Sequence, residues 1–187
     1  MSSPVRARLL SALAASIEDL GWEKTTTAEV VRRAKTSKRS FYQAFSSREE
    51  AFCALYEHEA AALQAALLAA LAQHQDPHAR VDAGLAAYVE HFQARPRLLR
   101  EMLLGPLHLG AQGVGLRRRN QQAFVALLSH EMVRGGLSAE QAPLLARVFV
   151  GGANDMLLEA VEDPERPQLD TMKEKLRLAF SALSPQR

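Results

Sequence analysis

Apolar side chains recur every three or four positions along nearly the whole chain, which is the spacing of a helix that buries one face. The first run places Leu9, Leu13, Ile17 and Leu20 on one face and stops at Gly21. We find no alternating pattern of the kind that paired strands show. The sequence therefore predicts an all-α protein.

Proline and glycine divide this pattern into separate segments. Short helices are expected over about 27–34 and 38–44, with Ser37 as the N-cap of the second, followed by a long helix over about 47–73. Four glycines between 105 and 115 predict a mobile loop. Five further helices are expected over about 78–94, 96–104, 115–134, 138–162 and 168–183.

About nine helices result, and they divide into a small N-terminal domain at 1–46 and a larger helical body at 47–187. The length of 187 residues suits one or two domains. Hydrophobic residues make up 48% and charged residues 24%, which is typical of a folded globular chain and excludes disorder as the main state.

The chain has a single cysteine, Cys53, so a disulfide scaffold is excluded and a reducing cytoplasm is expected. There is no run of about 18 apolar residues, so we expect no membrane partner. The first residues lack the apolar core of a secretory signal, which agrees with a cytoplasmic protein.

Basic residues are concentrated in one short stretch, Val30–Arg48, which contains no acidic residue. On a chain whose net charge is only +2, such a block indicates a surface that binds a polyanion. The alternative is a solvated helix face. The basic residues are Arg32, Arg33, Lys35, Lys38, Arg39 and Arg48.

The two short helices at 27–34 and 38–44 are joined by the three-residue turn Lys35-Thr36-Ser37, as in a helix-turn-helix. The basic end of the second helix would enter the major groove of DNA. The inner face would hold Val30, Val31, Ala34, Phe41 and Phe45. The outer face would present Ser37, Lys38, Arg39, Ser40 and Tyr42.

Three segments, Gly21-Trp22, Thr26–Ala34 and Ser37–Phe52, resemble the DNA-binding region of TetR-type transcriptional regulators. The resemblance covers about residues 6–55. It implies a helix-turn-helix domain followed by a helical ligand-binding and dimerisation domain. It also favours a repressor over an activator.

The resemblance implies a role for each matching position. Thr26 and Thr27 would open the first helix of the motif and touch phosphate, while Tyr42 and Arg48 would each bind a further phosphate. Independently of the family, a guanidinium fits guanine O6 and N7, so Arg39 is the candidate for reading a base. The predicted DNA-binding residues are Thr26, Thr27, Lys35, Thr36, Ser37, Lys38, Arg39, Ser40, Tyr42 and Arg48.

Two positions depart from the pattern. Lys35 stands where the family usually has glycine, so either the turn differs or Lys35 adopts a strained positive φ. Arg48 replaces the usual lysine, which preserves the charge and changes the geometry of the donors.

The segment 138–162 is apolar on two faces and so needs burial on two sides. One face can meet its own core and the other a second copy, or the helix is simply buried in a monomer. A four-helix homodimer interface, and hence a near-palindromic operator, is our prediction. Its residues would be Val150, Gly151, Leu157, Leu158, Met172, Leu176 and Phe180.

The resemblance also implies a pocket in the body for a small hydrophobic or amphipathic effector. The candidates, each of which could equally be ordinary core, are Tyr88, His91, Phe92, Met102, Leu103, Phe124, Leu128 and Phe149. The run Arg117–Arg119 is either a solvated helix start or a site for an anionic ligand such as an acyl-CoA.

We expect no catalytic residue, no metal and no cofactor. His74 and His78 have the spacing of a helical metal pair, but Pro77 between them breaks the helix. The alternatives to a regulator are a helical interaction module that binds no DNA and a small-molecule-binding enzyme. Arg39→Ala or Tyr42→Ala should abolish DNA binding only in a regulator.

Overall fold

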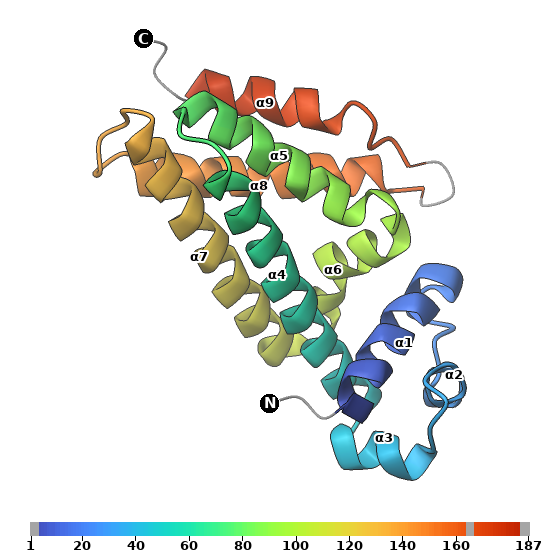
Figure 1. Ribbon diagram of the computed structural model, residues 1–187. Helices are drawn as coiled ribbons and strands as arrows, with labels where there is room; N and C mark the ends of the chain where they lie inside the picture. The colour runs from blue at the N-terminus through green and yellow to red at the C-terminus, as the bar shows by residue number, and fades with distance from the viewer. Residues whose placement is uncertain (1–3, 164–166, 184–187) are drawn as a thin grey trace. The chain divides into compact units, whose positions relative to one another are not determined.

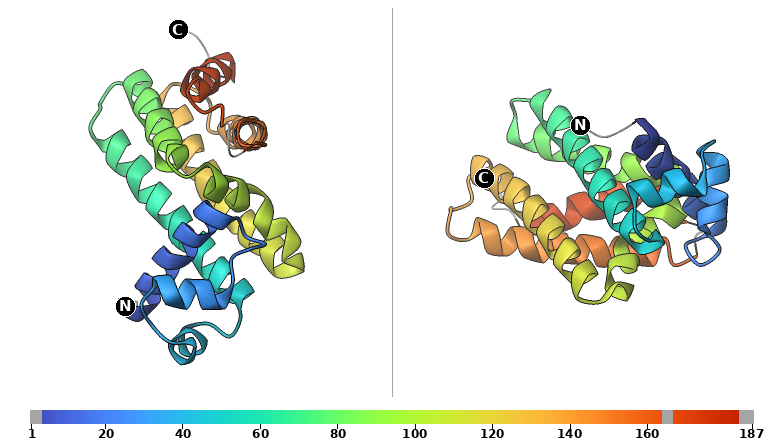
Figure 2. Two further views of the ribbon diagram at one scale, coloured as in Figure 1. Left: turned by 90° about the vertical axis from the view of Figure 1, so that its right-hand side faces the viewer. Right: turned by 90° about the horizontal axis from the view of Figure 1, so that it is seen from below.

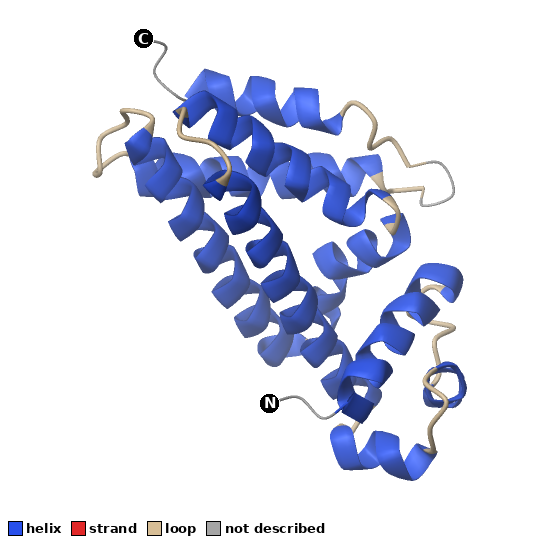
Figure 3. Ribbon diagram, in the orientation of Figure 1, coloured by secondary structure: helices blue, strands red, loops and turns tan. Residues whose placement is uncertain are grey.

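The computed structural model describes residues 4–163 and 167–183, and every regular element in this part is a helix (Figure 3). The all-α prediction with nine helices is confirmed for these residues. Figure 1 labels the helices α1 (Pro4–Leu20), α2 (Thr27–Arg33), α3 (Lys38–Ala44), α4 (Arg48–Ala72), α5 (Pro77–Gln93), α6 (Pro96–His108), α7 (Gly110–Arg134), α8 (Ala142–Ala160) and α9 (Met172–Leu183).

The helices group into two compact units. The first unit comprises Met1–Glu59 and Arg95–Leu116, and the second comprises Ala60–Ala94 and Arg117–Arg187. Helices α4 and α7 each continue from one unit into the other. These two units are defined by which residues contact one another. The predicted domain boundary at residue 46 instead divides the chain by expected function, and it remains a prediction.

In the first unit, α1, α2 and α3 pack together around a small apolar core (Figure 1). Leu9, Leu13 and Ile17 recur every four residues on α1, and all three are buried. This spacing places them in one row along the helix. The predicted inner face of the helix-turn-helix is confirmed, since its members Val30, Val31, Ala34, Phe41 and Phe45 are all buried.

Helix α6 belongs to the same unit, although it lies about 50 residues further along the sequence than α3. It packs against α1, and two polar contacts join the helices. The backbone N–H of Leu98 donates to a Glu18 carboxylate oxygen at 2.9 Å. The Arg97 guanidinium donates to the carbonyl of Asp19 at 3.3 Å. Glu18 thus caps the first turn of α6, because the side chain of the N-cap residue Arg95 forms no capping hydrogen bond and instead binds Glu59.

The predicted loop over 105–115 is wrong, because α6 continues to His108 and α7 begins at Gly110. Glycine serves close packing here. A Cβ on Gly105 would lie 2.4 Å from Phe52 Cζ, and one on Gly113 would lie 2.0 Å from the carbonyl oxygen of Pro106. Among the four glycines of this stretch only Gly110 has a positive φ, +60°, and it forms the turn between the two helices.

In the second unit, an ion pair between the half-buried Arg80 and the buried Glu131 connects α5 and α7. Arg80 binds Glu131 through two nitrogen–oxygen contacts of 2.7 and 2.8 Å. The remaining Arg80 nitrogen donates to the carbonyls of Leu71 and His74, at the end of α4. The hydrogen bonds from Arg80 lower the pKa of Glu131. The pair therefore joins α5 and α7, and Arg80 also ties them to the carbonyls at and just after the C-terminal end of α4.

Helix α9 packs against α5 and α8, as Figure 2 shows from two directions. Phe180 of α9 meets Phe149 of α8 edge to face, with ring centroids 5.6 Å apart. The buried row of α8 is alanine-rich, which lets its neighbours approach closely. It comprises Ala142, Ala146, Phe149, Ala153, Leu157 and Ala160.

Four residues predicted for the dimer interface lie instead in the core of the second unit. These are Leu157, Met172, Leu176 and Phe180. Of the other three, Gly151 is exposed, and Val150 and Leu158 are half-buried. The large apolar side chains that α8 exposes are Leu144 and Val148, which are not among the predicted interface residues. Periodicity identifies two apolar faces, but only packing against α5 and α9 decides which is inside.

Candidate nucleic-acid interface

The two short helices of the motif each begin with a side-chain cap. Thr26 is the N-cap of α2, and its hydroxyl accepts a hydrogen bond from Glu29 N at 3.2 Å. Ser37 is the N-cap of α3, as predicted, and its hydroxyl accepts from Ser40 N at 3.1 Å. Both hydroxyls replace backbone partners that a helix start lacks, which stabilises helices of only seven residues.

The turn between α2 and α3 contains a lysine in the left-handed conformation. Lys35 has a φ of +49°, so the turn keeps the shape that usually calls for glycine. The N–H of Thr36 donates to Val31 O at 3.0 Å and that of Lys35 donates to Arg32 O at 3.2 Å. These two bonds form the Schellman motif, which closes the end of α2 and holds the strained residue in place.

The outer surface of α3 carries the side chains predicted to meet DNA. Lys38, Arg39 and Tyr42 are exposed, and Tyr42 packs its ring edge to face against the buried Phe41 at 5.4 Å. The Ser37 and Ser40 hydroxyls lie 3.0 Å apart and bond to each other. The two serines therefore shape the start of α3, while the long side chains extend into solvent.

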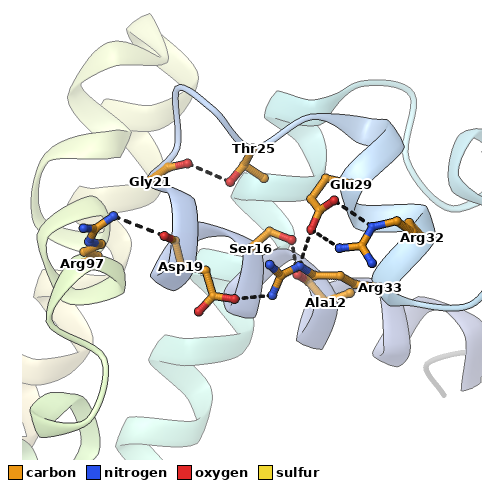
Figure 4. Close-up of polar contacts among 9 residues, drawn as sticks. All are labelled: Ala12, Ser16, Asp19, Gly21, Thr25, Glu29, Arg32, Arg33 and Arg97. Carbon is orange, nitrogen blue, oxygen red and sulfur yellow. Dashed lines mark hydrogen bonds and ion pairs between the residues drawn. The ribbon is translucent and has the colours of Figure 1, made fainter.

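The basic block divides into two parts in space. Glu29 binds both arginines of α2, with 2.6 Å to Arg32 Nη2 and 2.5 Å to Arg33 Nε (Figure 4). Arg33 also binds Asp19 of α1 at 2.5 Å. Hydrogen bonds from Arg32 and then Arg33 lower the pKa of Glu29 from 4.5 to about 2. These two arginines are therefore partly neutralised and connect α2 to α1.

Three cations of the block remain without an acidic partner. Within residues 4–163 and 167–183, Lys35, Lys38 and Arg39 form no ion pair, and all three are exposed. They lie in the turn and the first turn of α3. We call Lys35, Lys38, Arg39 and Tyr42 the α3 surface; its positive charge and aromatic hydroxyl suit a phosphate backbone and base edges.

Arg48, predicted to bind phosphate, has partners within the chain. Its guanidinium lies over the Trp22 ring at 4.1 Å and donates to the carbonyl of Thr25 at 2.8 Å. Thr26 is exposed, and Thr27 and Thr36 are half-buried. Arg48 is therefore engaged within the chain, unlike the three cations of the α3 surface.

Sequence reasoning missed the acidic partners of the basic block. Glu29 lies three and four residues before Arg32 and Arg33, and this spacing is the signal that could have identified the pair. No local signal connects Arg33 with Asp19, or Arg48 with Trp22, because these partners lie 14 and 26 residues apart.

The predicted effector residues are divided between the units. Met102 and Leu103 lie on α6 in the first unit, and the other six lie in the second. In the second unit, the Tyr88 hydroxyl donates to Asn154 Oδ1 at 3.4 Å, and His91 packs edge to face on Phe92 at 4.6 Å. Phe92, Met102 and Phe149 are buried, and Tyr88, His91, Leu103, Phe124 and Leu128 are half-buried.

Residues 9–55 match the family model described as bacterial regulatory proteins, tetR family. This segment is a tetR-family domain. The match covers most of α1, all of α2 and α3, and the beginning of α4, so the α3 surface lies within the tetR-family domain. The resemblance to TetR-type transcriptional regulators is confirmed. No curated protein matches the chain.

Several solved structures share the fold of this chain. A transcriptional regulator from Rhodococcus sp. Rha1 is 19% identical with a TM-score of 0.80, covering 95% of both chains. The fatty acid degradation regulator FadR from Bacillus halodurans is 12% identical with a TM-score of 0.84, covering 100% of this chain and 98% of its own. FadR from Bacillus subtilis, in complex with stearoyl-CoA, is 12% identical with a TM-score of 0.76, and the match covers 92% of this chain and 95% of the FadR chain.

These similarities show the fold beyond residues 9–55. Over nearly its full length the chain has the fold of solved structures that include proteins described as TetR-like and TetR-family transcriptional regulators. In the part of the chain that the structure describes, no helix is long and apolar enough to cross a membrane.

Proposed function

We propose that the chain is a ligand-responsive repressor that binds a near-palindromic operator as a homodimer and is released by a small hydrophobic or amphipathic effector. The observation that carries this proposal is the α3 surface of the tetR-family domain. Its three cations have no acidic partner in the described residues and its tyrosine is exposed. Binding of such a surface to DNA is favourable because its cations release the counterions condensed on the phosphates.

The side chains of the α3 surface bind different parts of the DNA. Arg39 reads guanine through O6 and N7, since its planar guanidinium can donate to both atoms at once. Lys38 and Lys35 neutralise phosphates, and the Tyr42 hydroxyl donates to another. Thr26 and Ser37 hold the helix starts, so they position these groups.

The homodimer is supported by an apolar surface on α8. Leu144 and Val148 are exposed there, and a Cβ on Gly151 or Gly152 would meet no atom of the chain within 4 Å. Leu178 of α9 is 74% exposed. A second copy that covers these side chains would remove them from water and could approach closely at the glycines. These residues replace the buried ones in our interface prediction.

The effector is proposed to bind among the helices of the body. The Nδ2 of Asn120, on α7, is buried and has no hydrogen-bond partner among the described residues. An unpaired buried donor is unfavourable, and a ligand oxygen would satisfy it. Asn120, Phe124 and Leu128 recur every four residues, so they share one face of α7. The stearoyl-CoA complex of Bacillus subtilis FadR supports an amphipathic effector.

Release of DNA requires that the effector favour a conformation in which the two α3 surfaces no longer fit successive major grooves. Helix α4, which continues from the first unit into the second, is the proposed lever. An effector that releases the operator should change the distance distribution between spin labels on the two α3 helices. An unchanged distribution would exclude this mechanism.

The test begins with selection of bound sequences from random duplex DNA by the purified protein. The selected sites should be near-palindromic. Arg39→Ala and Tyr42→Ala should lose binding while remaining folded dimers. Arg134→Ala, which removes an exposed charge from α7, is the matched control and should bind normally. An interaction module would select no sequence even as the wild type.

A further inference from the structure

Arg48 makes three contacts to one short segment of the chain. Its Nη1 donates to Thr25 O at 2.8 Å and to Trp22 O at 3.4 Å. Its Cζ lies 4.1 Å from the centroid of the Trp22 ring. The side chain is only 30% exposed, and its Nε lies 3.6 Å from Glu49. The guanidinium is thus engaged by two carbonyls and an aromatic face.

The segment that Arg48 contacts is the link between α1 and α2. Gly21 ends α1 with a φ of +77°, and the buried Thr25 hydroxyl donates to Gly21 O at 2.7 Å (Figure 4). Thr26, the N-cap of α2, follows directly. The hydrogen bonds from Arg48 to the carbonyls of Trp22 and Thr25 therefore fix the position at which α2 starts.

A second residue of α4, Phe52, also contacts Trp22. Phe52 lies one helical turn after Arg48 and is buried, with its ring centroid 5.0 Å from that of Trp22. Residues four apart lie on one face of a helix, so Arg48 and Phe52 contact Trp22 from the same face of α4. The link between α1 and α2 is therefore anchored on the first turns of α4.

We propose that Arg48 is a positioning residue for DNA binding rather than a phosphate ligand. It sets the start of α2, and through the short turn at Lys35 it sets the α3 surface. To bind phosphate, its guanidinium would have to leave the Thr25 and Trp22 carbonyls. Lys38 and Arg39 have no such competing partners in the described chain. This inference rests on the proposed function.

The salt dependence of binding separates the two roles. Each phosphate contact adds about 0.9 to the slope of log affinity against log salt. With the duplex selected by the wild type as the probe, Lys38→Ala should lower the slope by about that amount per lost contact. Arg48→Gln should weaken binding about tenfold at every salt concentration and leave the slope nearly unchanged.

Trp22, the only tryptophan, supplies a readout without DNA. Arg48→Gln should change its fluorescence emission, because the stacked guanidinium is lost, whereas Lys38→Ala should not. Arg48→Lys keeps the charge but lacks the planar fork of donors, so it should also perturb the emission and weaken binding at an unchanged slope. Cooperative thermal unfolding of each variant shows that it is folded.

The inference is overturned if Arg48→Gln lowers the slope as much as Lys38→Ala and leaves Trp22 emission unchanged. Arg48 would then be a phosphate ligand, and the proposed function would stand. If the wild type selects no duplex at low salt, the proposed function itself fails.

Discussion

Lys35 stores backbone strain at the turn between α2 and α3. A left-handed conformation costs a non-glycine residue about 1–2 kcal/mol, and glycine avoids this cost but loses part of the advantage because its more flexible unfolded chain loses more entropy on folding. The two Schellman bonds to Val31 and Arg32 hold the residue there. The strain places a cation beside Lys38 and Arg39, where DNA is proposed to bind.

Lys35→Gly should therefore raise the free energy of unfolding by about 1 kcal/mol relative to Lys35→Ala. Both variants remove the same charge, so their difference isolates the backbone. Urea denaturation of the two proteins measures it. Equal stabilities would mean that the turn relaxes when lysine is replaced. Both should lower the salt slope of operator binding equally.

Glu29 makes the stability of the helix-turn-helix depend on pH. Its pKa is lowered to about 2 in the folded chain, chiefly by hydrogen bonds from Arg32 and Arg33. A lowered folded pKa favours the ionised form in the fold. The contribution is therefore complete above the ordinary value of 4.5 and is lost as the pH falls to about 2.

Glu29→Gln should accordingly be less stable than the wild type at pH 6, and the difference should shrink between pH 4.5 and 2. Denaturant unfolding at a series of pH values measures this gap. Comparing the two proteins cancels the other acidic groups, including Glu50 and Glu131. A gap that stays constant with pH would show that the ion pairs contribute nothing.

Residue roles could be predicted where their partners are close in sequence. The Ser37 cap and the buried Phe41 and Phe45 follow from local pattern, and the Lys35 strain follows from a known turn shape. The partners of Arg48 are carbonyls 23 and 26 residues earlier, which no spacing rule reveals.

At the scale of elements, the corner between α6 and α7 depends on glycine. Gly113 faces the backbone of Pro106, with only 2.0 Å between a Cβ and the carbonyl oxygen. When only flexibility is considered, a glycine-rich sequence predicts a loop. The segment 105–115 instead forms the end of α6 and the start of α7, because glycine has no side chain to prevent close packing. By contrast, α3 lies over the predicted residues, Lys38–Ala44, because caps and periodicity agree there.

Gly113→Ala should destabilise the protein by about 1–3 kcal/mol, because backbone atoms cannot move aside as a flexible side chain can. Gly84→Ala is the matched control. Its Cβ would lie 3.5 Å from Leu71 Cδ2, an ordinary contact, so helix propensity should stabilise it by up to about 1 kcal/mol. Thermal unfolding distinguishes the two. A neutral Gly113→Ala would indicate that the corner opens readily.

At the scale of the whole molecule, the exposed face of α8 is the candidate surface for contact with a second copy. The sequence shows that α8 has two apolar faces but not which one is inside, because that depends on the distant α5 and α9. Packing uses Phe149 and Leu157, together with Phe180 of α9. The face left to solvent carries Leu144, Val148 and two glycines, and it is the better candidate for a homodimer.

Val148→Glu tests this assignment, because a carboxylate buried in an apolar interface without a partner is strongly unfavourable. Val148 is 53% exposed in the single chain, so the variant should fold normally but sediment as a monomer at micromolar concentration. Leu68→Glu is the control, since Leu68 is 50% exposed on α4 and gains the same charge. It should remain a dimer. A monomer contacts one half-site only, so Val148→Glu should also lose most of its operator affinity. If both variants sediment as dimers, the interface lies elsewhere on the chain.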